Sequence, residues 1–175
     1  MKPILTALAT LALALALITP ASAALAVGAQ APDFTAHGAQ GGTIMTVNLS
    51  DLLKKGPVVL YFFPSVFSGG SSAESREFAD NIDKFRAAGA TVLGMSRDTL
   101  DTLARFSTEE CASKFPMASA DESTVNGFDV NDGAQFNTRT TYVIAPSGKI
   151  AFVDDDDDYS NHVKRALAFV QAMKN

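Results

Sequence analysis

The pattern of apolar and polar positions predicts strands that alternate with helices. Val58–Phe63 is a short, continuous apolar run with a proline on each side, which is typical of a strand buried on both faces. Pro64–Gly70 follows as a loop. Ser71-Ser72 then precede a stretch, up to about Ala88, with apolar residues three and four positions apart, which predicts an amphipathic helix. Gly89 is a natural end for that helix.

The rest of the chain continues this alternation. We expect an extended lead-in over Val27–Phe34, a turn or small hairpin around Gly38–Gly42, a short helix over Asn48–Lys55, strands at Thr91–Ser96, Met117–Ala120, Thr140–Ile144 and Lys149–Val153, and helices at Thr99–Phe115 and Tyr159–Met173. Residues 121–138 are polar, so we expect mostly loop, with a helical turn around Thr124–Phe128. The predicted fold class is α/β, with a mixed central sheet flanked by helices on both faces.

The first residues form a segment that does not belong to this fold. Met1-Lys2 gives a positive start, Pro3–Pro20 is almost wholly apolar, and Ala21-Ser22-Ala23 is a cleavage signature. We therefore expect a signal peptide over residues 1–23, one domain over residues 24–175, and a periplasmic or secreted protein. The alternative is a membrane anchor, but the apolar run is short for a span, which needs about 20 residues. We expect no membrane association after cleavage.

Charge and composition exclude several classes of function. The net charge is −5 and becomes −6 when Lys2 leaves with the signal peptide, so we expect no nucleic-acid binding, which needs a basic patch. One cysteine, Cys111, and two histidines, His37 and His162, leave no disulfide framework and no transition-metal cluster, and we expect no cofactor. We expect both histidines at the surface and the run Asp154–Asp158 as a solvated acidic turn rather than a calcium site.

The loop between the apolar strand Val58–Phe63 and the helix that follows it contains a motif typical of a reactive site. Pro64, Ser68 and Ser71 form the pattern P-x-x-x-S-x-x-S, and Arg139 opens a late strand. This combination resembles the active-site motif P-x-x-x-T/S-x-x-C of peroxiredoxins (AhpC/TSA), of the bacterioferritin-comigratory-protein or PrxQ type. Ser71 then stands on the position of the peroxidatic cysteine. Gly69 stands where the family usually has a proline.

The resemblance extends over nearly all of residues 27–173. It includes the entry Ala31–Phe34 and the hairpin Ala145–Lys149. It implies a thioredoxin-like fold and, for the family, reduction of hydrogen peroxide and organic hydroperoxides with thioredoxin-like donors. Members of this type are monomers or dimers, and the sequence does not decide between the two.

Serine at position 71 changes the chemistry that such a motif supports. A thiol reduces peroxide as the thiolate, which a helix N-terminus and an arginine favour, whereas a hydroxyl is scarcely ionised near neutral pH. The simplest function of Ser71 is to cap the helix N-terminus. Arg139 either pairs with an acidic residue in solvent or faces this pocket. If it faces the pocket, the site has lost its balancing anion and would attract a small external one.

Cys111 lies near the end of the second predicted long helix, where some members of the family carry a resolving cysteine. It is either a small buried residue or a reactive thiol, and Glu109 and Glu110 would raise its pKa. Three functions stay open. The first is a peroxiredoxin-family protein with a disabled peroxidatic site. The second is a thiol peroxidase that works through Cys111 or as an active serine variant, with a thioredoxin-like reductant. The third is a module that binds a small anion or a protein.

Overall fold

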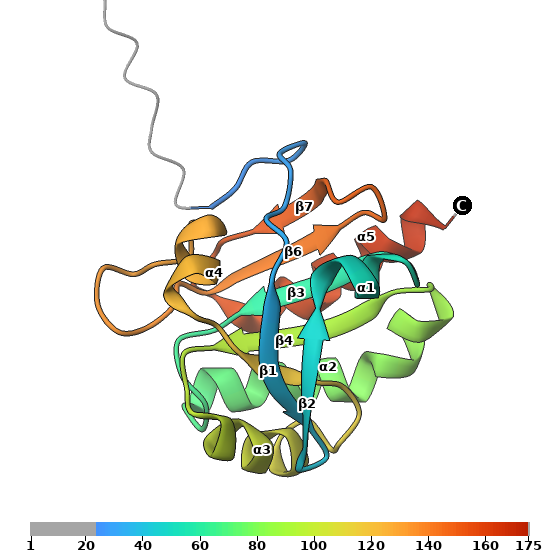
Figure 1. Ribbon diagram of the computed structural model, residues 1–175. Coiled ribbons are helices and arrows are strands. Elements are labelled where there is room, and N and C mark those ends of the chain that lie inside the picture. Colours follow the sequence, from blue (N-terminus) through green and yellow to red (C-terminus); the bar gives the residue numbers. More distant parts are fainter. Residues whose placement is uncertain (1–23, 175) are drawn as a thin grey trace, which may run out of the picture.

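Seven strands form one mixed sheet in the computed structural model, which describes residues 24–174 (Figure 1). The strands are β1 (Thr35–Gln40), β2 (Thr43–Asn48), β3 (Val58–Phe62), β4 (Thr91–Ser96), β5 (Met117–Ser119), β6 (Thr140–Ile144) and β7 (Ile150–Asp154), in the spatial order β2-β1-β5-β4-β3-β6-β7. The pairs β3–β4 and β4–β5 are parallel, and all other neighbours are antiparallel. The predicted mixed sheet is confirmed.

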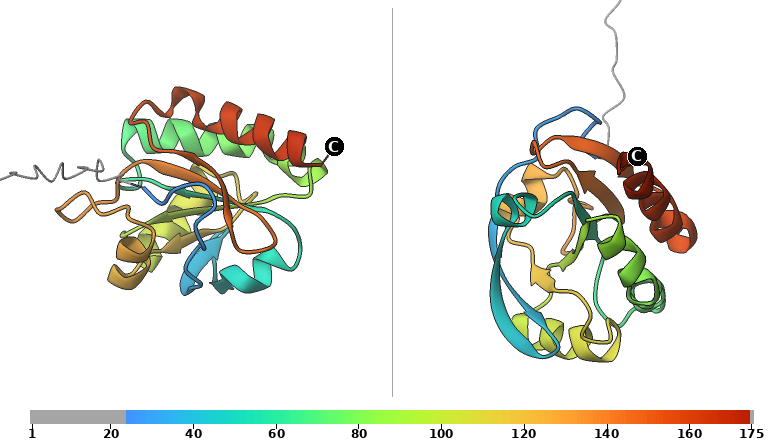
Figure 2. Two further views of the ribbon diagram at one scale, coloured as in Figure 1. Left: turned by 90° about the horizontal axis from the view of Figure 1, so that it is seen from above. Right: turned by 90° about the vertical axis from the view of Figure 1, so that its right-hand side faces the viewer.

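Helices cover both faces of this sheet. They are α1 (Leu49–Leu53), α2 (Gly69–Ala87), α3 (Leu100–Glu109), α4 (Glu122–Gly127) and α5 (His162–Met173), the last preceded by a 3₁₀ turn, η1 (Tyr159–Asn161). The apolar residues of α2, α3 and α5 share one core cluster, and those of α1 and α4 share the other. Figure 2 shows α2 and α5 side by side on one face.

Strand β3 is the centre of both cores. Its side chains alternate, with Val58, Leu60 and Phe62 in one cluster and Val59 and Tyr61 in the other, and all five residues are fully buried. This two-sided burial explains why the strand is a continuous apolar run rather than an alternating one. The loop that follows β3 therefore starts from a strand that is enclosed on both faces.

Several helix boundaries differ from the sequence prediction; α5, for example, begins at His162 rather than Tyr159, because the three residues before it form the 3₁₀ turn η1. Helix α3 ends at Glu109 rather than Phe115, because Ala112 and Ser113 adopt positive φ angles of 49° and 60°, which a right-handed helix cannot contain. Helix α2 begins at Gly69, two residues before Ser71. Short helix α4 lies within the segment predicted to be mostly loop, at the predicted helical turn.

The N-terminal lead-in is tied to the far edge of the sheet. The amides of Gly28 and Ala31 donate to the carbonyl oxygens of Ile150 and Gly148, and the amide of Leu25 donates to the Tyr142 hydroxyl at 2.9 Å. The predicted signal peptide, residues 1–23, lies outside the described residues. Among residues 24–174, no helix is both long and apolar enough to cross a membrane.

Candidate functional site

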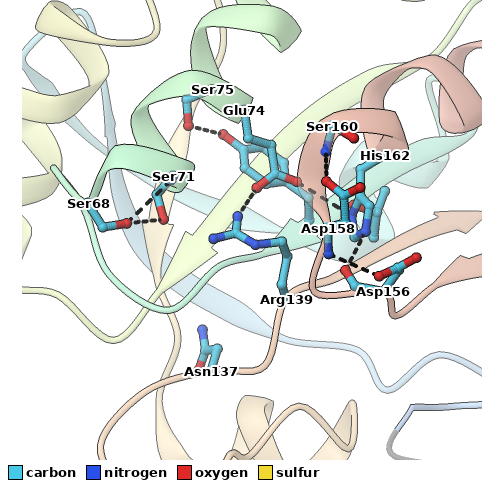
Figure 3. A network of polar contacts seen from close by, with 12 residues as sticks. Ser68, Ser71, Glu74, Ser75, Asn137, Arg139, Asp156, Asp158, Ser160 and His162 are labelled. Atoms are coloured by element: carbon cyan, nitrogen blue, oxygen red, sulfur yellow. Dashed lines mark hydrogen bonds and ion pairs between the residues drawn. The ribbon is translucent and has the colours of Figure 1, made fainter.

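The loop between β3 and α2 brings Ser68 and Ser71 together. Ser68 is the N-cap of α2, and its hydroxyl oxygen accepts the backbone amide of Ser71 at 3.3 Å and lies 2.8 Å from the Ser71 hydroxyl oxygen (Figure 3). Ser71 is fully buried in the first turn of the helix. The expectation that Ser71 caps the helix is wrong, because Gly69 and Gly70 already belong to it and leave the cap to Ser68.

The same loop contains a strained residue. Phe67, directly before the N-cap, has a φ of 55°, a left-handed conformation that is uncommon for a bulky side chain. Its ring packs edge-on against Phe106 at 5.2 Å, and the preceding amide, of Val66, donates to the Asp98 carboxylate at 2.9 Å. These contacts hold the loop in a shape that presents Ser68 to the helix. Pro64, at the start of the loop, is half-buried.

Arg139 lies directly before β6 and points toward α2. Only 8% of the residue is exposed, and its Nη1 donates to Oε2 of Glu74 in a buried ion pair (Figure 3). Its Nη2 approaches the first turn of α2 and lies 3.2 Å from where a side chain on Gly70 would begin. Arg139 therefore faces the pocket, but its charge has a partner. The expectation of an unbalanced guanidinium is wrong, because Glu74 supplies the anion.

Glu74 and His162 form a buried polar cluster behind this ion pair. Oε1 of Glu74 lies 3.5 Å from Nδ1 of His162, and that nitrogen lies 3.0 Å from the Thr141 hydroxyl. The other ring nitrogen, Nε2, lies 2.7 Å from the backbone carbonyl oxygen of Asp156, which can only accept a hydrogen bond. Nε2 therefore carries the hydrogen. His162 is fully buried, so its predicted surface position is wrong.

Burial dominates the electrostatics of this cluster. It raises the pKa of Glu74 from 4.5 to about 7, although Arg139 acts in the opposite direction. It also lowers the pKa of His162, against the charge of Asp154. Asp154 is only 5% exposed and pairs with Arg165 at 2.9 Å, so the first residue of the predicted acidic turn belongs to the core, whereas the other four are exposed.

Glu74 and His162 are the polar site residues that sequence reasoning missed. Glu74 follows Ser71 by three positions, which places both on one helix face and was the available signal. The sequence around His162 contains one hint that this end of the helix is buried, the apolar residue Val163 directly after it. His37 is exposed on β1, as predicted for a surface residue.

Cys111 lies just after α3, and its contact on α2 is Ser75, one helical turn beyond Ser71. The residue is fully buried, and its thiol interacts with the hydroxyl of Ser75, which lies 2.9 Å from the Tyr61 hydroxyl. Burial and the neighbouring Glu110 raise the pKa of the Cys111 thiol far above its usual range, as predicted for an acidic neighbour. Such a thiol is a poor nucleophile.

Comparisons with known proteins agree with this arrangement. The model of the AhpC/TSA family matches residues 27–153. Peroxiredoxin Bcp of Escherichia coli (strain K12) is 31% identical over 123 residues, which cover 66% of this chain and 78% of the relative. A putative peroxiredoxin of Mycobacterium tuberculosis (strain CDC 1551 / Oshkosh) is 31% identical over 133 residues, or 73% and 86% of the two chains.

Solved structures show the same fold. Peroxidoxin BcpB from Mycobacterium tuberculosis superposes with a TM-score of 0.77 at 28% identity, covering 85% of this chain and 98% of its own. A cysteine-to-serine mutant of PrxQ from Xylella fastidiosa gives a TM-score of 0.76 at 25% identity, with coverages of 86% and 98%. The α/β sheet is thus the predicted thioredoxin-like fold, and the family implies peroxide reduction. The chain belongs to the AhpC/TSA family of peroxiredoxins.

Proposed function

We propose that this protein has lost the peroxide-reducing step of its family and acts outside the cytoplasm as a binding protein. One observation carries the proposal. The buried first turn of α2, between the N-cap Ser68 and the ion pair of Arg139, holds the hydroxyl of Ser71 and no sulfur. A helix N-terminus and an arginine, which both favour a thiolate, lie beside this position, but the group that occupies it is an alcohol.

The chemistry of peroxide reduction depends on that sulfur. A thiolate attacks one peroxide oxygen and becomes a sulfenic acid, while the O–O bond breaks and the second oxygen leaves, with a proton, as water or an alcohol. The hydroxyl of Ser71 cannot be oxidised in this way. Its hydroxyl is also not activated, because it is paired with the hydroxyl of Ser68, and the imidazole of His162 is occupied by Thr141 and a backbone carbonyl.

The alternative, a peroxidase that works through Cys111, finds little support in the geometry. The thiol is enclosed by the core between α2 and α3, and both burial and Glu110 oppose the thiolate. Peroxide would need access to a buried sulfur that is almost entirely protonated at neutral pH.

Peroxide consumption with a dithiol reductant or a thioredoxin tests the proposal. We expect wild type and Cys111→Ala to consume peroxide no faster than the reductant alone. Ser71→Cys should gain turnover, because the helix N-terminus and Arg139 would favour its thiolate. Ser72→Cys, one position further along and away from the Ser68 cap, is the matched control and should stay inactive.

Two results would contradict the proposal. Turnover by wild type that disappears in Cys111→Ala would make Cys111 the reacting group. Turnover by wild type that persists in Cys111→Ala would assign peroxide reduction to a group other than a cysteine, because Cys111 is the only cysteine of the chain. A silent Ser71→Cys with an intact circular dichroism spectrum would show that more than the sulfur has been lost.

We also propose that the protein is exported, with residues 1–23 removed. The support is the positive start, the apolar stretch and the motif Ala21-Ser22-Ala23. The first residues of the domain that follows are part of the folded structure, since Ala24 is buried and the amide of Leu25 donates a hydrogen bond to the Tyr142 hydroxyl. A cleavage after Ala23 would leave both contacts intact.

A further inference from the structure

The two edges of the sheet are protected to different degrees. An edge strand exposes backbone amides and carbonyls that pair with other chains, unless charges, prolines, bulges or a covering segment prevent it. Strand β7 has such protection: the lead-in covers its start, its pairing with β6 contains a register shift between Val143 and Ile144, and the exposed aspartates of residues 155–158 follow it. Within the described chain, β2 lies at the other end of the strand order and has none of these features.

The segment around β2 is uncharged. Residues 34–50, which include β1, β2 and the turn between them, contain no aspartate, glutamate, lysine, arginine or proline. Strand β2 is rich in β-branched residues, which favour an extended backbone, and its register with β1 is continuous over its whole length. The side chain of Ile44 is half exposed. The edge is therefore regular, partly apolar and free of charge.

Alternate residues of β2 direct their backbone groups away from β1. The amide of Leu49, directly after β2, donates to the carbonyl oxygen of Phe34, directly before β1. Because the bonded residues of an antiparallel pair alternate, the odd-numbered residues of β2 bond to β1, and Ile44 and Thr46 face the free side. Among the described residues, the amides and carbonyls of Ile44 and Thr46 have no hydrogen-bond partner.

We propose that the β2 edges of two copies of this chain pair in antiparallel fashion across a two-fold axis at Met45, so that one sheet runs through both copies. In this register Ile44 of each copy lies opposite Thr46 of the other. The free amides and carbonyls of both residues are then all paired. The inference goes beyond the proposed function, because it does not depend on the chemistry at Ser71.

The distribution of charge favours a second copy as the occupant of this edge. Near a two-fold axis a residue lies close to its own counterpart, so a charged residue there would meet the same charge. Strand β2 contains no charged residue and avoids this repulsion. Pairing through β7 would instead bring two exposed runs of aspartates together, in a chain whose net charge is already −5.

The side chains beside the axis fit this pairing. Met45 shares a strand face with Val47 and packs against the core cluster that contains Val47. Across the axis it meets the Met45 of the second copy, and two flexible thioethers extend the apolar layer. A groove of about 640 Å³ between β2 and α1 has Val47 and Leu52 in its lining. It receives the turn of the second copy, where Gly41 and Gly42 have no side chain to collide with α1.

Size-exclusion chromatography with light scattering on the purified protein tests the inference. Wild type should have twice the mass of one chain. Thr46→Pro should have the mass of one chain, because it removes an amide at the contact between the copies while the bonds to β1 stay in place. Thr46→Val keeps that amide and is the matched control, which should remain a dimer.

A disulfide across the axis tests the register. Met45 lies opposite its own counterpart in a non-hydrogen-bonded pair, where Cβ atoms approach most closely. In a Cys111→Ala background, Met45→Cys should therefore form a covalent dimer on mild oxidation. Thr43→Cys, on the same strand face, is the control. It should stay uncoupled, because the two cysteines would lie roughly 14 Å apart along the paired strands, too far for a disulfide.

Several results would overturn the inference. Wild type that is monomeric over the whole accessible concentration range would leave this edge to a different chain. A dimer that survives Thr46→Pro would use another surface. If Thr46→Pro fails to fold, the disulfides decide, and equal coupling of Met45→Cys and Thr43→Cys, or none in either, refutes the pairing. Peroxide turnover by wild type would refute the proposed function and leave the mass and the disulfide unchanged.

Discussion

At the scale of single residues, the site is organised by one buried carboxylate. Glu74 is fully buried, yet it lies between a cation and a neutral imidazole rather than in solvent. A buried ion pair of this kind contributes little net stability, because desolvation of both ions offsets their attraction. It does fix orientation, and here it holds the Arg139 guanidinium against the helix turn that carries Ser71.

The raised pKa of Glu74 predicts how stability depends on pH. The folded protein holds this proton more tightly than the unfolded chain, so the contribution of Glu74 is fully present below pH 4.5 and is lost as the pH rises toward 7, by roughly 3 kcal/mol. His162 acts in the opposite direction, since its pKa is lowered on folding. Glu74→Gln should remove the pH dependence of stability that Glu74 contributes and leave the contribution of His162 in place.

Urea unfolding of wild type and Glu74→Gln between pH 4 and 8 measures this effect. The difference in unfolding free energy, wild type minus variant, should fall as the pH rises. Glu109→Gln, in an exposed pair with Arg105, is the control and should give a nearly constant difference. Parallel curves for wild type and Glu74→Gln would show that the carboxyl keeps an ordinary pKa.

At the scale of elements, the start of α2 decides the geometry of the site. The helix contains two glycines in its first turn, and they are not equivalent. A Cβ on Gly69 would meet nothing within 4 Å, whereas one on Gly70 would meet Nη2 of Arg139 and the ring of Tyr159, each at 3.2 Å. Gly70 therefore allows the guanidinium to approach the backbone, whereas the space around Gly69 would accommodate a side chain.

This difference predicts opposite effects for two otherwise identical substitutions. Gly69→Ala should stabilise the protein by up to about 1 kcal/mol, the helix preference of alanine over glycine. Gly70→Ala should forfeit that gain, because Arg139 is held by Glu74 and can yield only by straining the ion pair. Thermal unfolding of both variants gives the comparison. A Gly70→Ala protein as stable as Gly69→Ala would mean that Arg139 is not held closely against the helix.

At the scale of the whole molecule, the N-terminal lead-in closes the domain over its last hairpin. The backbone hydrogen bonds from Gly28 and Ala31 and the bridge between Gln30 and Lys149 cover the hairpin turn and the first residue of β7, Ile150 (Figure 1). The backbone groups that are paired there do not pair with other chains. The predicted leader ends where this lead-in begins, so its removal would not uncover β7.

The export proposal predicts a defined mature N-terminus. Expressed in a bacterium with a periplasm, the full chain should reach the periplasm or medium, with a mass that corresponds to residues 24–175 and an N-terminal Ala24. Small residues at positions 21 and 23 fit signal peptidase, so Ala23→Lys should leave the leader attached. Full-length wild type confined to the cytoplasm would contradict the proposal.

The sequence by itself determined the elements and the motif. The continuous apolar run of β3, the helix period of α2 and the spacing of Pro64, Ser68 and Ser71 are local properties, and local properties can be recognised without coordinates. The end of α3 at Glu109 was missed, because the left-handed residues Ala112 and Ser113 are neither glycine nor asparagine.

Only the tertiary structure decided what surrounds Ser71. Glu74, Arg139 and His162 come from α2, the start of β6 and α5, and nothing in their sequence separation brings them together. Their charges depend on burial, which a chain acquires only when the helices pack on the sheet. The sequence therefore shows that residue 71 is a serine, whereas the charge state of the groups around it depends on the fold.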